Sequence, residues 1–177
     1  MKKMNFRLIA VLSVISIVVA LSSCKSKLDK SLELITPFKK YITGKLVLDS
    51  IPQQFDTVLY RFVQDFPKHN KSISYLYAAS QIAEKRGNGP KAAEYSAFYI
   101  DQYPSEKKYR MELAVVAGHY YEMNTQFEKA LKYYDILANE FPAEPIAKQA
   151  AVTAKMIRLG LITPEQQLEY LKQQIVK

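Results

Sequence analysis

Leu137-Ala138-Asn139-Glu140-Phe141-Pro142 is the stretch that decides the fold, because two earlier segments end in the same way. Those segments end at Pro67 and Pro104, directly after Phe66 and Tyr103. The three prolines are spaced 37 and then 38 residues apart. Proline lacks an amide hydrogen and disfavours helical geometry in the residue before it, so each aromatic-proline pair predicts the end of a helix. Helix ends at so constant an interval are typical of a helical repeat.

The residues before each proline form the same apolar stripe. Steps of four, three and four place its members on one face of a helix. The stripes are Phe55, Leu59, Phe62 and Phe66; Ala92, Ser96, Tyr99 and Tyr103; and Ala130, Tyr134, Leu137 and Phe141. Partner helices are predicted over about 71–86, 106–123 and 144–159, and the only β-like run is Lys45-Leu46-Val47-Leu48. The sequence therefore predicts an all-α fold of repeated helix–turn–helix units.

Several short motifs predict where helices start and stop. Capping boxes, with a hydroxyl residue three positions before an amide or carboxylate, occur at 50–53 and 125–128. Thr163-Pro164-Glu165-Gln166 predicts the start of a final helix, and Gly87-Asn88-Gly89-Pro90 predicts a tight turn with Pro90 at the first helical position. Pro37 is expected to interrupt or end an early helix, and Gly160 to stop a late one.

The third unit resembles a tetratricopeptide repeat (TPR). Its small and large residues match that family's pattern at Ala114, Ala117, Gly118, Tyr121, Ala130, Tyr134, Leu137 and Pro142. The second unit matches at Leu76, Ala79, Ser80, Ala83, Ala92, Tyr99 and Pro104. Gly118 and Ala130 are expected to be small because the two helices of a unit touch there, whereas the first unit departs from the pattern with Phe55 at the small position. The resemblance implies a TPR-like helical-hairpin solenoid, a right-handed superhelix with units of about 31–67, 71–104, 108–142 and 144–177.

In the TPR family, the first helices of successive hairpins build a concave groove that often binds a peptide or a partner's helix. Carrying the family's groove positions over to this chain gives seven candidate partner-binding residues, on the second and third units. They are Tyr77, Gln81, Glu84, Glu112, Val115, His119 and Glu122. Aromatic, amide and carboxylate side chains together suit a peptide backbone and basic side chains. A simpler reading, that these residues are merely exposed, also stays open.

The first residues have the three parts of a secretory signal peptide, predicted over 1–23. Lys2, Lys3 and Arg7 precede an uncharged apolar run of fourteen residues, 8–21. Because a bilayer core of about 30 Å needs roughly 20 residues, this run is too short for a permanent transmembrane helix. Leu21-Ser22-Ser23-Cys24 resembles the lipobox of bacterial lipoproteins. The resemblance implies cleavage before Cys24, lipid on that cysteine, and a membrane anchor.

Residues 24–30 are then expected to be the lipidated cysteine and its tether, and 31–177 the repeat domain. Lys25 favours the outer membrane, since aspartate at that position retains lipoproteins at the inner membrane in enteric bacteria. The aromatic-proline helix ends also resemble, more weakly, those of the TPR lipoprotein of the outer-membrane β-barrel assembly machinery. These likenesses imply a bacterial cell-envelope location outside the cytoplasm.

Composition narrows the function classes. Without residues 1–23 the chain carries 22 basic and 17 acidic residues, a modest excess spread along the sequence, and nucleic-acid binding would require a clustered basic face. The two histidines, His69 and His119, stand in no metal-ligand spacing, and no nucleophile or phosphate-loop motif occurs. We therefore expect no catalytic residues, no metal and no cofactor. The leading hypothesis is a non-enzymatic protein-binding scaffold or assembly factor. A glycan- or cell-wall-binding lipoprotein is the alternative, which the absence of Trp disfavours.

Overall fold

The computed structural model describes residues 25–43 and 48–175, and every regular element within these ranges is a helix. The prediction of an all-α fold is confirmed. The elements are α2 (Lys27–Ile35), η1 (Thr36–Phe38), α3 (Lys39–Thr43), η2 (Leu48–Ser50), α4 (Phe55–Asp65), α5 (Ser72–Lys85), α6 (Gly89–Gln102), α7 (Arg110–Met123), α8 (Phe127–Glu140), α9 (Pro145–Arg158) and α10 (Pro164–Ile175). The predicted signal peptide, Cys24 and most of the β-like run lie outside the described residues. None of the described helices has the length and apolarity needed to cross a bilayer.

The chain divides into two units, residues 1–39 and 40–177. In the first, a capping box that the sequence analysis missed starts α2. The Ser26 hydroxyl accepts a hydrogen bond from the Asp29 amide at 3.1 Å, and the Asp29 carboxylate accepts one from the Ser26 amide at 3.3 Å. The tether expected over 24–30 therefore includes the first turn of a helix. That helix ends at Ile35, just before Pro37, as predicted.

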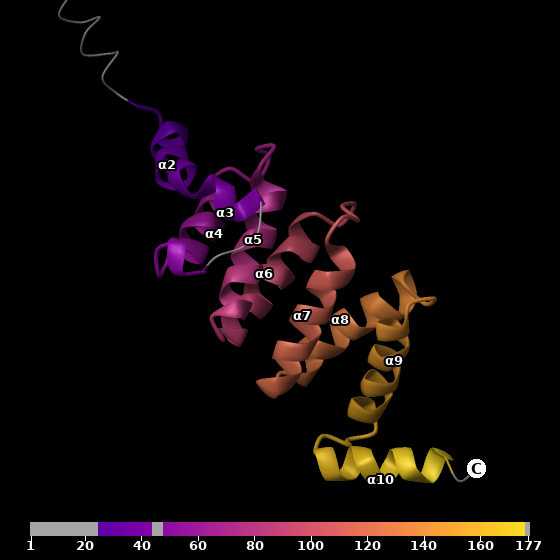
Figure 1. Ribbon diagram of the computed structural model, residues 1–177. Helices are drawn as coiled ribbons and strands as arrows, with labels where there is room; N and C mark the ends of the chain where they lie inside the picture. The colour runs from indigo at the N-terminus through magenta and orange to yellow at the C-terminus, as the bar shows by residue number, and fades with distance from the viewer. Residues whose placement is uncertain (1–24, 44–47, 176–177) are drawn as a thin grey trace, which may run out of the picture. The chain divides into compact units, whose positions relative to one another are not determined.

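In the second unit, helices α4 to α9 pack in chain order, each on the next, as adjacent antiparallel pairs (Figure 1). The predicted stripes form the core of these pairs, since Phe55, Leu59, Ala92, Tyr99 and Leu137 are all buried. The aromatic residue before each proline is only half-buried and closes its helix, donating its amide to the carbonyl four residues earlier. The prediction that helices end at these prolines is confirmed.

Small residues allow close contact where the sequence predicts it. A Cβ atom placed on Gly118 of α7 would lie 2.6 Å from the Tyr134 ring of α8, so only glycine fits that position. At the equivalent contact between α5 and α6, the buried hydroxyls of Ser80 and Ser96 are 2.8 Å apart and hydrogen-bonded. Ala130 is fully buried. The helices of both hairpins therefore pack against each other through small side chains.

Two of the predicted helix starts are wrong. Ser50 lies in the short η2 element, and α4 begins five residues later, at Phe55. Thr125 does not cap α8, because its backbone has a φ of 56° and its amide donates to the Glu122 carbonyl at 2.8 Å. Thr125 thus completes the end of α7 and is not free to begin the next helix.

The last helix starts as the sequence predicts. Thr163 and Gln166 form reciprocal hydrogen bonds, in which the Gln166 amide donates to the Thr163 hydroxyl at 3.3 Å and the Thr163 amide donates to the Gln166 side chain at 3.1 Å. Gly160, with a φ of 74°, ends the preceding segment after α9. Pro90 stands at the second helical position of α6 and not at the first, because that helix begins at Gly89.

Candidate functional site

The seven candidate residues occupy one side of α5 and one side of α7. On α5, Tyr77, Gln81 and Glu84 follow each other at steps of four and three, and the intervening Ala78, Ala79 and Ile82 are buried. On α7, Glu112, Val115, His119 and Glu122 follow each other at steps of three, four and three. All seven are half-buried or exposed, so their side chains are accessible. The structure brings them together in two clusters.

The first cluster bridges the two helices, and we call it the Glu112 cluster: Tyr77, Gln81, Glu84 and Glu112. The Tyr77 hydroxyl donates to both Glu112 carboxylate oxygens, at 2.9 and 3.0 Å. The Gln81 amide donates to Glu112 at 3.1 Å and to Glu84 at 3.4 Å. Neutral donors therefore hold two carboxylates of different helices near one another.

The Tyr77 ring is itself fixed in place. It stacks on Tyr109, with ring centroids 3.9 Å apart and planes 10° from parallel. Burial, followed by the hydrogen bond to the Glu112 carboxylate, raises the pKa of Tyr77 to about 12. The phenol thus stays protonated and continues to donate to Glu112 at neutral pH.

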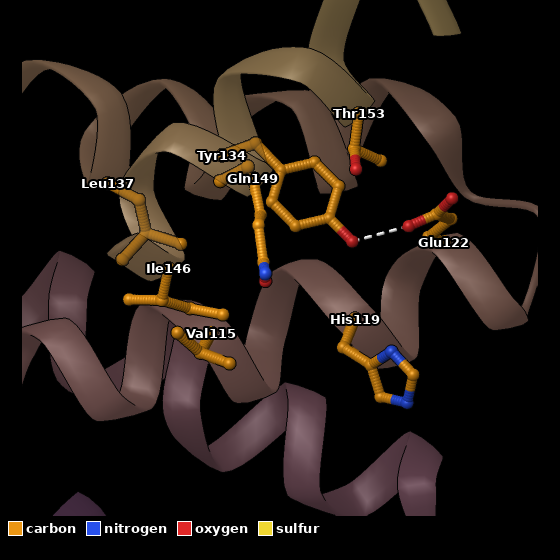
Figure 2. A pocket seen from close by; sticks show the side chains of 9 residues that line it. Val115, His119, Glu122, Tyr134, Leu137, Ile146, Gln149 and Thr153 are labelled. Atoms are coloured by element: carbon orange, nitrogen blue, oxygen red, sulfur yellow. Dashed lines mark hydrogen bonds between the residues drawn. The ribbon is translucent and has the colours of Figure 1, made fainter. Parts of the chain in front are cut away.

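The second cluster lines a pocket of about 240 Å³ formed by α7, α8 and α9, which we call the Glu122 pocket (Figure 2). Its lining residues are Val115, His119 and Glu122 from α7, Tyr134 and Leu137 from α8, and Ile146, Gln149, Ala150 and Thr153 from α9. Figure 2 shows the aliphatic side chains of Val115, Leu137 and Ile146 gathered at one end and Glu122 at the other.

Polar groups line the end of this pocket that is opposite the aliphatic side chains. The Tyr134 hydroxyl donates a hydrogen bond to the Glu122 carboxylate, drawn as a dashed line in Figure 2. Burial, and then this hydrogen bond, raise the pKa of Tyr134. His119 is exposed on the pocket wall. Its ring lies edge-on to the Tyr120 ring, with the two ring centroids 5.1 Å apart. The pocket can therefore take an apolar group at one end and a hydrogen-bond donor or a cation at the other.

Sequence reasoning missed the walls that α8 and α9 contribute to the pocket. Tyr134 and Leu137 belong to a stripe interpreted wholly as core, although both also line the pocket. Ile146, Gln149 and Thr153 lie on α9, which packs on α8. Extending the groove positions of α5 and α7 to α9 would have identified these residues. Among the residues the structure describes, no group of three or more His, Cys, Asp or Glu side chains is placed to hold a metal ion.

No protein-family model matches the chain, and comparisons with curated proteins and with solved structures find no significant similarity.

Proposed function

We propose that this protein is a membrane-anchored scaffold or assembly factor of the bacterial cell envelope, built as a TPR-like solenoid and without enzymatic activity. Lipid on Cys24 anchors it, at the outer membrane, and a partner protein binds in the groove formed by the first helices of successive hairpins. The hairpin order of α4 to α9 and the small-residue contacts at Gly118 and Ser80 support the TPR-like part of the proposal.

One observation supports the binding function. The predicted groove residues are accessible, and contacts between neighbouring hairpins hold several of them in position. Tyr77 and Gln81 reach across from α5 to Glu112 on α7. Farther along α7, Val115 and Glu122 open onto a pocket that α9 completes. A surface whose side chains are already held in position loses less entropy on binding, which favours recognition.

Photo-crosslinking in cells tests this function. A photoreactive amino acid replaces Gln149, an exposed residue of the Glu122 pocket, and Glu128, an exposed residue of α8, serves as the control position. We expect a defined protein adduct from position 149 and none from position 128. Combining the probe with Tyr77→Ala, His119→Ala and Glu122→Ala is expected to remove the adduct. An adduct that persists in the variant would show that Tyr77, His119 and Glu122 do not form the binding site. Recovery of cell-wall glycan alone, without a protein adduct, would make glycan binding the leading explanation.

The anchor has its own test. A Cys24→Ser variant is expected to lose incorporation of a labelled fatty acid and to leave the membrane fraction, because stable anchoring needs two or more acyl chains. A Cys24→Ser protein that stays labelled and membrane-bound would contradict the lipid anchor without bearing on the groove.

A further inference from the structure

The groove carboxylates Glu84, Glu112 and Glu122 differ from four ion-paired carboxylates of the helical array in the groups that contact them. Asp56, Asp101, Asp135 and Glu140 each lie within 4.0 Å of a lysine or arginine nitrogen. Within residues 25–43 and 48–175, no such cation pairs with Glu84, Glu112 or Glu122. Among the described residues, these three accept side-chain hydrogen bonds only from the neutral groups of Gln81, Tyr77 and Tyr134.

This difference leaves negative charge available on the groove. A neutral donor fixes the position of a carboxylate without cancelling its charge, whereas an internal lysine or arginine cancels it. The lining of the Glu122 pocket includes no lysine or arginine. The groove is thus acidic in a chain that has 22 basic and 17 acidic residues without the predicted signal peptide, so its local charge is opposite to that of the chain as a whole. Complementary charge favours a cationic partner and disfavours an anionic one.

The pocket adds an apolar requirement at a fixed distance. Val115 and Glu122 are seven residues apart on α7, which is roughly 10 Å along a helix. An extended peptide covers that distance in about three residues, at ~3.3 Å for each. A side chain that enters between Val115, Leu137 and Ile146 therefore places a residue two to four positions away beside Glu122.

We propose, on the basis of the function proposed above, that the groove binds a cationic segment of a partner protein. An apolar side chain of that segment fills the aliphatic end of the Glu122 pocket. A lysine or arginine two to four residues away pairs with Glu122, and a further basic residue pairs with Glu84 and Glu112 in the Glu112 cluster. The neutral donors hold the three carboxylates in position for these cations.

Selection from a peptide library tests the proposal. The full chain is immobilised in nonionic detergent, and phage displaying random 12-residue peptides are selected on it at 150 mM salt. The same selection is run on the isosteric variant Glu84→Gln, Glu112→Gln, Glu122→Gln. The matched control is Glu128→Gln, Glu144→Gln, Glu165→Gln, which removes three exposed carboxylates that do not line the pocket. Circular dichroism verifies that all three proteins are equally helical.

We expect the wild-type pool to be enriched in peptides that carry Lys or Arg two to four residues from Leu, Ile, Phe or Met. For the best peptide, the groove variant is expected to raise the Kd about tenfold, which is roughly 1.4 kcal/mol for the three carboxylates together, since partly exposed ion pairs are individually weak. The control variant is expected to stay within about twofold. Replacing the apolar residue of the peptide by Ala is expected to weaken binding as well.

Two outcomes would overturn the proposal, and they separate it from the broader function. Peptides that lack basic residues but still require Tyr77 and His119 would refute the cationic partner and leave a protein-binding groove standing. Peptide pools that are identical on wild type and groove variant, together with no photo-adduct at position 149, would refute both.

Discussion

Gly118→Ala provides the most direct test of the hairpin packing. The new Cβ would lie 2.6, 2.8 and 3.3 Å from three ring atoms of Tyr134, where carbon atoms normally stay about 3.5–4.0 Å apart. The ring cannot move away easily, because Tyr134 is only 8% exposed and its hydroxyl is bonded to Glu122. Overpacking of this kind costs about 1–3 kcal/mol, and we take the upper end because the ring is confined. Alanine returns about 1 kcal/mol through its higher helix propensity. The net expectation is a loss of about 2 kcal/mol in the free energy of unfolding.

A double-mutant cycle with Tyr134→Leu isolates the steric cause. Leucine lacks the outer ring atoms, so Gly118→Ala is expected to become neutral or stabilising in that background, with a coupling energy of about 2–3 kcal/mol. Urea unfolding of the four proteins, followed by circular dichroism at 222 nm, measures each free energy. Equal effects of Gly118→Ala in both backgrounds would refute the packing argument.

Three further predictions concern single polar groups. Arg110, which is buried, holds Glu140 with two hydrogen bonds of 2.7 Å and lowers the pKa of Glu140 below its usual 4.5. The stability that this pair contributes is present above pH 4.5 and is lost as the pH falls through the lower pKa of the folded state. The urea concentration at the unfolding midpoint is therefore expected to decrease when the pH is lowered from 5 to 2.5. The decrease is expected to be smaller in Glu140→Gln. The Tyr99 hydroxyl is buried without a hydrogen-bond partner among the described residues, and burial raises the pKa of Tyr99 to about 12. Tyr99→Phe is therefore expected to raise the free energy of unfolding by about 1 kcal/mol at pH 7. Wild type is expected to lose stability to urea as the pH rises from 10 towards 12, and the Tyr99→Phe variant is expected to lose less. Asp56 is buried and accepts a hydrogen bond from Lys91 at 3.0 Å, so Asp56→Ala is expected to lower the free energy of unfolding in urea by about 2 kcal/mol; an unchanged midpoint would contradict this role.

The sequence predicted the helices well because two independent signals agree in each hairpin. The apolar stripe gives the buried face, and the proline gives the end of the helix. Phe66, Tyr103 and Phe141 close α4, α6 and α8 as expected. The small residue at Gly118 was likewise expected, because the TPR pattern places it where the two helices of a hairpin touch, and the Tyr134 ring there leaves no room for a Cβ atom.

Helix starts were predicted less well, because a hydroxyl residue in a short connection can serve either of the helices it joins. Thr125 follows α7 so closely that its amide bonds back to Glu122, and α8 begins at Phe127 with no side-chain cap. Ser26 was missed for a different reason. Its partner Asp29 lies in a segment expected to be a tether, where no apolar periodicity pointed to a helix.

The candidate site was predictable along each helix but not between helices. Spacing within α5 and α7 selects residues on one side of a helix, and the structure places all seven where they are accessible. Which donor reaches which carboxylate depends on contacts between residues far apart in the chain, such as Tyr77 with Glu112, and no local pattern encodes them. The same contacts position the candidate carboxylates without neutralising them. Glu112 and Glu122 accept hydrogen bonds from Tyr and Gln side chains, which fix their positions and leave their negative charge uncancelled. In the function proposed above, these neutral donors link the packing of the hairpins to the charge of the partner that the groove binds.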